Sequence, residues 1–201
     1  MLNSYADSLK NVLATGLRPV TQPLAGVLWH GTGEADAKAI VASQEWRLSN
    51  DWLYLWLGPA VYGFIDRDAS ESARVELRAE MAAKATAQFK TEKGIIEPPG
   101  AVIRAEYACE RVMDLESMDN DELVVRIQQA AAKVVHPSEK WRWDSQRPAF
   151  PGKLLHRFQE MLEPELRPQA YLFKSPPKGD GQREQSIAIV HLAGIKSYTL
   201  G

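Results

Sequence analysis

The chain has 201 residues, and its 45% hydrophobic composition is enough to bury one core, so we expect a single domain over residues 1–201. The formal net charge of −2 gives no overall attraction to nucleic acid, and the single cysteine excludes an internal disulfide and is expected in the core as Cys109. The short apolar runs and the absence of a signal-peptide pattern predict a cytoplasmic protein that does not enter a membrane.

The first elements combine helical periodicity with a short apolar run. Leu2 to Leu13 has apolar residues at helical spacing and predicts a helix, within an N-terminal segment of residues 1–18 that packs on the outside of the domain. Gly26 to His30 predicts a strand that delivers His30 to a loop formed by Gly31, Thr32 and Gly33. A helix is expected next, from Ala35 to Ala42.

The rest of the chain mixes helical and extended patterns without a regular β-α-β alternation, which favours an α+β fold. In chain order we expect extended segments over Tyr54–Leu57 and Ala60–Ile65, a helix from Ala69 to about Lys90, a strand over Ala101–Ala108, helices over Leu123–Val134 and Leu154–Leu162, and strands over Ala170–Phe173, Ser186–Leu192 and Lys196–Leu200.

Two motifs in the first third of the chain carry a specific resemblance. Leu28-Trp29-His30-Gly31-Thr32 is followed by Leu57-Gly58-Pro59-Ala60-Val61-Tyr62, with Tyr62 thirty-two residues after His30. The pair resembles the nicotinamide-pocket motifs of the His-Tyr-Glu ADP-ribosyltransferases, which carry His-Gly-Ser/Thr and a later Gly-x-x-x-Tyr. The resemblance implies a split, mainly antiparallel β core flanked by helices, with NAD as co-substrate and no metal.

The resemblance also implies a role for each motif residue, with His30 and Tyr62 facing one cleft. His30 would bind a ribose hydroxyl of NAD, the Gly31 backbone would pair with the nicotinamide carboxamide, and Tyr62 would stack on the nicotinamide ring. Thr32 completes the first motif. Read without the family, His30 is a strand-end histidine before an ordinary Gly31-Thr32 turn, and Tyr62 is a core tyrosine.

Two positions after Tyr62 depart from the family or leave its pattern open. Ser70 or Ser72 lies where the family has a helix-start serine that binds the carboxamide, although either residue could instead cap the helix. The family's second stacking tyrosine has no counterpart in this region. Trp52, Tyr54 or Trp56 would have to substitute for it, or the pocket is more open.

The third motif of the family is a glutamate that opens a late strand, and Glu184 precedes such a strand here, at the rim of the expected cleft. A carboxylate there can bind the ribose 2′-hydroxyl and orient the acceptor nucleophile. The alternation of Ile187 and Ile189, however, places Gln185 on their face of the strand. If Gln185 fills the position, only single ADP-ribose transfer is compatible with the site.

The acceptor has to be sought outside these motifs. The polar loop from Lys174 to Arg183 suits an exposed recognition element. Lys133 to Arg157 has a local charge balance of +4 with interleaved tryptophans, which is typical either of a nucleic-acid surface or of a charged surface whose tryptophans anchor in the core. Both RNA or DNA and protein therefore remain open as acceptors.

These observations predict an NAD-dependent mono-ADP-ribosyltransferase that releases nicotinamide, in the manner of a small bacterial toxin or phage-defence effector with an antitoxin as partner. One alternative is a catalytically inactive pseudo-transferase that binds NAD or ADP-ribose. Another is an NAD-dependent RNA 2′-phosphotransferase, although the spaced Arg-His-Arg-Arg set of that family cannot be assembled from this sequence.

Overall fold

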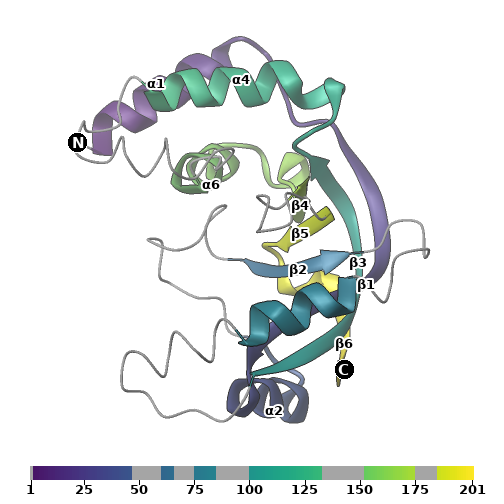
Figure 1. Cartoon of the computed structure of the whole chain (residues 1–201). Helices are drawn as coiled ribbons and strands as arrows, with labels where there is room; N and C mark the ends of the chain where they lie inside the picture. The colour runs from purple at the N-terminus through teal and green to yellow at the C-terminus, as the bar shows by residue number, and fades with distance from the viewer. Residues whose placement is uncertain (1, 47–59, 66–74, 85–99, 133–151, 175–184) are drawn as a thin grey trace.

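The computed structural model describes residues 2–46, 60–65, 75–84, 100–132, 152–174 and 185–201 (Figure 1). Its helices are α1 (Leu2–Ala14), α2 (Glu34–Ser43), α4 (Met118–Ala132), α6 (Gly152–Glu160) and a helix over residues 75–84. Its strands are β1 (Thr21–Gly33), β2 (Val61–Ile65), β3 (Gly100–Asp114), β4 (Ala170–Lys174), β5 (Gln185–Ile189) and β6 (Ile195–Leu200).

The described strands form one six-stranded sheet in the order β1-β2-β5-β4-β3-β6. Because β1 also pairs with β3, five of the strands close into a barrel and β6 lies beside β3 (Figure 1). All pairings are antiparallel except that between β3 and β4. The expected α+β class and the mainly antiparallel sheet are confirmed, whereas the closure into a barrel was not anticipated from the sequence.

The barrel consists of two halves that meet at two short seams. One half contains β1, β3 and β6, and the other contains β2, β5 and β4. The first seam joins β1 to β2 through the pairs Leu28–Ile65 and Trp29–Phe64 alone. The second joins Val112–Asp114 of β3 to Ala170–Leu172 of β4. The two seams are the shortest ladders of the barrel.

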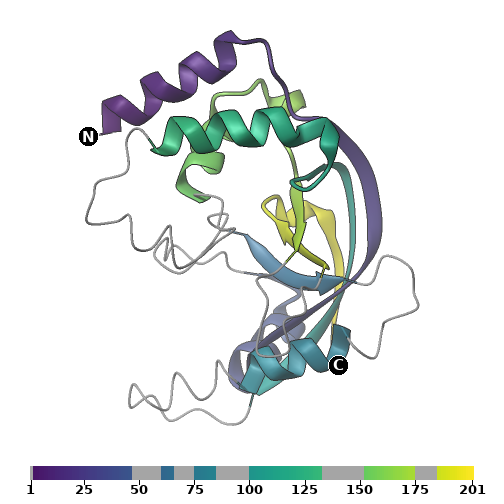
Figure 2. The same cartoon turned by 45° about the horizontal axis from the view of Figure 1, so that its top comes forward.

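Alternation along the strands divides the buried side chains between two cores. The barrel core takes one face of every barrel strand and includes Leu28, Val61, Ile103, Leu172 and Ile187. The helical core lies on the outer face, where α1, α4 and α6 pack against one another over Tyr171 and Ala188 (Figure 2). Cys109 is buried in the barrel core, as expected.

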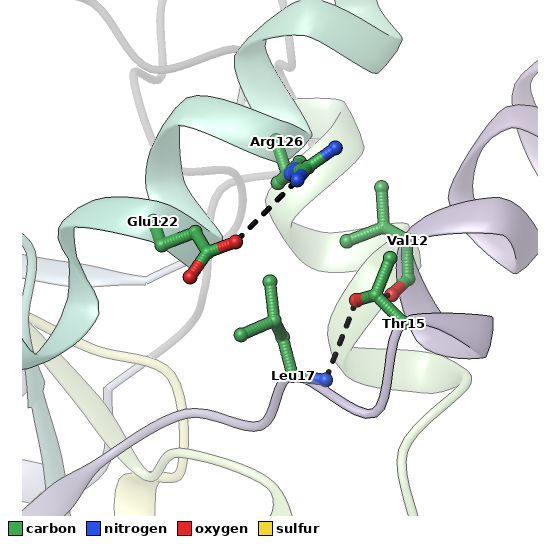
Figure 3. A network of polar contacts seen from close by, with 5 residues as sticks. All are labelled: Val12, Thr15, Leu17, Glu122 and Arg126. Atoms are coloured by element: carbon green, nitrogen blue, oxygen red, sulfur yellow. Dashed lines mark hydrogen bonds and ion pairs between the residues drawn. The ribbon is translucent and has the colours of Figure 1, made fainter.

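Helix α1 ends through a local hydrogen-bond network beside α4 (Figure 3). The Thr15 hydroxyl donates to the Val12 carbonyl at 2.6 Å, and Gly16 adopts a φ of 79°, which is inexpensive only for glycine. On the neighbouring helix α4, Arg126 forms an ion pair with Glu122 at 3.5 Å. Helix α1 contacts α4 and α6.

A buried asparagine attaches the segment between α1 and β1 to the start of α4. The Asn120 side chain accepts from the Val20 amide at 2.8 Å and donates to the carbonyls of Val20 and Asp114 at 2.9 and 3.0 Å. Its side chain is 1% exposed, so water cannot replace these partners.

Replacing Asn120 with alanine is expected to lower the free energy of unfolding by about 2–3 kcal/mol, because three buried polar groups lose their partner. Chemical denaturation would measure the change. Gln128→Ala on the exposed face of α4 is the matched control, with an expected change within about 0.5 kcal/mol. Equal effects of the two substitutions would show that the Asn120 clamp contributes nothing.

The structure confirms most predicted elements and corrects three. The segment Gly31-Thr32-Gly33 is not a loop, because β1 continues to Gly33 opposite Gly100 of β3. β3 runs past Ala108 to Asp114, because its last residues pair with the beginning of β1, where Thr21 lies opposite Met113. The last predicted strand but one stops at Ile189, since the amides of Val190 and His191 both donate to the Gln169 carbonyl and turn the chain. Of the helix expected from Ala69 to Lys90, residues 75–84 are helical and the remainder lies outside the described residues.

Candidate functional site

The β1–β2 seam opens into a fork at His30. The ladder between the two strands ends at Trp29 and Phe64, and from there β1 pairs with β3 alone while Val61 to Gly63 pair with β5. The imidazole of His30 crosses this opening, with Nδ1 lying 2.6 Å from the Tyr62 carbonyl oxygen. The His30 side chain thus contacts a backbone carbonyl of β2 just beyond the end of the β1–β2 ladder.

This contact defines which nitrogen of His30 carries the proton. A carbonyl oxygen only accepts, so Nδ1 donates to Tyr62 and carries the hydrogen. Burial lowers the pKa of His30 from 6.5, an effect that the hydrogen bond to Tyr62 partly opposes. The ring is therefore neutral near pH 7, and Nε2 presents a lone pair to which a hydroxyl group can donate.

Trp46 supports the other side of the imidazole and was not anticipated as a site residue. Its ring meets that of His30 edge to face, with centroids 4.6 Å apart, and lies 5.8 Å from the ring of Tyr198. The Gln44 side chain fixes this corner because it both donates to the Tyr198 carbonyl and accepts from the Tyr198 amide, at 3.1 and 3.2 Å. The sequence alone does not indicate the role of Trp46, because its position depends on the hydrogen bonds between Gln44 and Tyr198.

The lowered pKa of His30 predicts a pH-dependent stability. The unfolded chain binds a proton at about pH 6.5, whereas folded His30 binds it only at lower pH. Stability conferred by neutral His30 is therefore complete above that range and lost as the pH falls through it. We expect the free energy of unfolding to drop more between about pH 7.5 and about pH 5.5 in the wild type than in His30→Asn.

The comparison with His30→Asn also removes the contribution of the other histidines. His191 has a lowered pKa as well and contributes in the same direction, but it is present in both proteins. Chemical denaturation at the two pH values, together with the NMR titration of the His30 ring, would check the prediction. A His30 ring that titrates at or above its ordinary pKa would contradict it.

Tyr62 meets His30 through its backbone, while its ring goes to the outer face of β2. The phenol ring is partly buried and meets Phe173 edge to face, with centroids 6.4 Å apart. Val61 and Ile65 on either side belong to the barrel core, the face that also carries Leu28 and, by alternation, His30. The structure therefore brings the two motifs together through the Tyr62 backbone, but the expectation that both side chains face one cleft is wrong, because alternation along β2 turns the Tyr62 ring to the opposite face.

Gly31 lies next to His30 and is covered by the helix over residues 75–84, the unlabelled helix between β2 and α2 in Figure 1. A Cβ atom at this position would lie 2.5 Å from the Ala83 amide nitrogen and closer still to the Ala79 carbonyl oxygen. Gly100 meets the same helix at Ala83. Helix packing is thus a reason for glycine at position 31, in addition to the ligand approach that the resemblance implies.

The remaining members of the expected site are only partly within the described residues. Thr32 is partly buried in β1 opposite Ala101. Gln185 opens β5 on the face of Ile187, and its side-chain amide donates to the Phe173 carbonyl at 3.4 Å. It lies three residues, about 10 Å of strand, before Ala188, the partner of Tyr62.

Several predicted residues lie outside the described part of the chain. They are Glu184, the serines Ser70 and Ser72, the aromatic residues Trp52, Tyr54 and Trp56, the loop over residues 175–183, and residues 133–151 of the basic segment. The choice between Glu184 and Gln185 for the third motif therefore stays a prediction.

No protein-family model matches the chain, and no curated protein is similar to it. Within the described ranges, no three His, Cys, Asp or Glu side chains are grouped as metal ligands. None of the described helices is long and apolar enough to span a membrane. The case for a function accordingly rests on the two motifs and the geometry of the fork.

Proposed function

We propose that the chain is an NAD-dependent mono-ADP-ribosyltransferase that transfers ADP-ribose to a macromolecule and releases nicotinamide. The observation that carries the proposal is the contact of His30 Nδ1 with the Tyr62 carbonyl at the fork. It joins the two motifs that resemble the transferase family across a place where the sheet opens. The mainly antiparallel sheet, with its two halves joined at short seams, also supports an ADP-ribosyltransferase fold.

The neutral imidazole suits the sugar of NAD better than its phosphates. With Nδ1 committed to Tyr62, Nε2 is an acceptor and has no hydrogen to donate to an anion. A ribose hydroxyl can donate to it and thereby fix the orientation of the sugar. The backbone of Gly31 would offer its polar groups to the carboxamide. The ring of Tyr62 lies on the opposite face against Phe173, so the stacking role that the resemblance implies would require the ring to leave that contact.

The reaction breaks the bond between ribose C1′ and the nicotinamide nitrogen, and nicotinamide leaves with the electron pair. The transition state has oxocarbenium character, so an enzyme gains from groups that hold the sugar and stabilise positive charge. The acceptor nucleophile then bonds to C1′ and loses its proton. Glu184 is the proposed base for this proton, and the carboxylate that holds the ribose 2′-hydroxyl.

The direct test is incubation with NAD labelled in its adenylate half, in the presence of cell-lysate protein, RNA and DNA in separate reactions. We expect label in one fraction and an equal release of nicotinamide. Mass spectrometry of that fraction would identify the acceptor. The proposal fails if no fraction is labelled and no nicotinamide is released.

Matched variants at the start of β5 separate the two candidates for the third motif. Glu184→Gln should abolish transfer while NAD binding persists, and Gln185→Asn should leave transfer largely intact. The reverse pattern would assign the position to Gln185. NAD binding by calorimetry without any nicotinamide release would instead select the pseudo-transferase, which an amide at this position favours. NAD-dependent removal of a 2′-phosphate from RNA would select the RNA 2′-phosphotransferase.

A toxin or phage-defence role is a proposal at the level of the cell. If the transferase modifies an essential macromolecule, its production in a bacterial host should stop growth, and an antitoxin protein should relieve the arrest. The catalytically disabled Glu184→Gln protein is the control. Normal growth of cells that make active enzyme would rule out a toxin for that host.

A further inference from the structure

Two arginines and a histidine gather at the end of the barrel remote from His30, where β3, β4 and α6 meet. Arg111 lies near the end of β3, eight residues after Ile103, the partner of His30. This separation corresponds to roughly 25 Å of strand, so the group does not belong to the fork. Arg167 follows α6 and precedes β4, and His191 follows β5.

The backbone and side chain of Gln169 hold these segments together. Its amide donates to the Arg111 carbonyl at 2.8 Å, and its carbonyl accepts from the His191 amide at 3.2 Å. Its side-chain oxygen accepts from the amides of Glu110 and Arg111 at 2.7 and 3.2 Å. The backbones of Arg111 and His191 are therefore held together by the hydrogen bonds of Gln169.

Both guanidinium groups are oriented by neutral carbonyls. Arg111 Nε donates to the Arg167 carbonyl at 2.9 Å, and Arg167 donates to the carbonyls of Leu162 and Glu160 at 2.9 and 3.1 Å. No acidic side chain in the described part of the chain forms an ion pair with either arginine. Burial lowers the pKa of His191, and the nearby charges of Arg111 and Arg167 lower it further.

We propose that Arg111, Arg167 and His191 form a binding site for a phosphate group. Arginines held in place with N–H groups to spare match the oxygens of a phosphate in geometry and charge. A bound anion would offset the positive charge of the two guanidinium groups. Arg111 and Arg167 are partly buried and His191 is exposed, so the site is accessible from solvent. The site is independent of the proposed transferase activity.

The phosphate can come from a small ion or from a nucleic-acid backbone, and two probes distinguish the sources. Inorganic phosphate and a short single-stranded oligonucleotide would be titrated into the full chain by calorimetry and NMR. Binding of phosphate that the oligonucleotide does not displace identifies a small-ion site. Oligonucleotide binding that competes with phosphate and weakens with salt identifies a backbone site.

Variants with matched charge changes provide the decisive comparison. Arg111→Gln and Arg167→Gln should weaken binding by about tenfold or more, whereas Arg126→Gln on α4 should leave it unchanged. Because both arginines also hold the fold, His191→Glu is a second test that introduces a negative charge at an exposed position. The proposal is overturned if the wild type binds neither probe, or if Arg111→Gln, Arg167→Gln and His191→Glu all bind as tightly as the Arg126→Gln control.

Discussion

Replacement of His30 by alanine is expected to reduce nicotinamide release from NAD by on the order of 100-fold or more. The substitution removes the Nε2 acceptor for the ribose and the Nδ1 donor that joins β1 to the Tyr62 carbonyl. A sugar that is no longer held in one orientation reacts more slowly even when NAD still binds. Steady-state kinetics of nicotinamide release would measure the loss, which rests on the proposed transferase activity.

Two amide variants divide the effect between the two nitrogens of the ring. Asparagine can place its amide near the position of Nδ1 and keep the contact with Tyr62, while glutamine reaches the position of Nε2. We expect His30→Asn to fold almost as stably as the wild type yet to be nearly as inactive as His30→Ala. His30→Gln should retain part of the activity. Full activity of His30→Asn would show that His30 only supports the fold.

Local patterns predicted the elements but not how they meet. The helical spacing of apolar residues predicted the positions of α1, α2, α4 and α6, because an amphipathic face depends only on the sequence of its own helix. The predicted end of β1 at His30 was too early, because two glycines suggest a loop. Pairing with β3 instead keeps Gly31 and Gly33 extended. Such pairing between distant segments leaves no mark on either segment alone.

The residues of the candidate site were likewise predicted from local patterns, but their contacts were not. His30 and Tyr62 were identified from their motifs, and the structure places them in contact. The support from Trp46 could not be foreseen, because it depends on how the residues after α2 meet β6. Alternation did predict that Gln185 shares a face with Ile187, since that inference needs only the period of a strand.

Gly31→Ala is expected to be the most damaging small substitution in the motif, at about 3 kcal/mol of unfolding free energy. The added methyl group would collide with the Ala79 carbonyl and the Ala83 amide of the covering helix. Because both obstacles are backbone atoms, the collision cannot be relieved by a rotamer change, and the helix over residues 75–84 has to shift.

Gly26→Ala in the same strand is the matched control. Its Cβ would meet only the Tyr107 side chain, at ordinary distances of 3.4 Å and more, so we expect a change within about 0.5 kcal/mol. Chemical denaturation of the two variants compares the same substitution at Gly31, which a helix covers, and at Gly26, where the nearest atoms belong to the Tyr107 side chain. Equal stability would mean that the helix does not rest on Gly31, and the glycine would then have to be explained by a ligand. A large loss for Gly31→Ala alone would establish that the first motif is constrained by the fold before any NAD is bound.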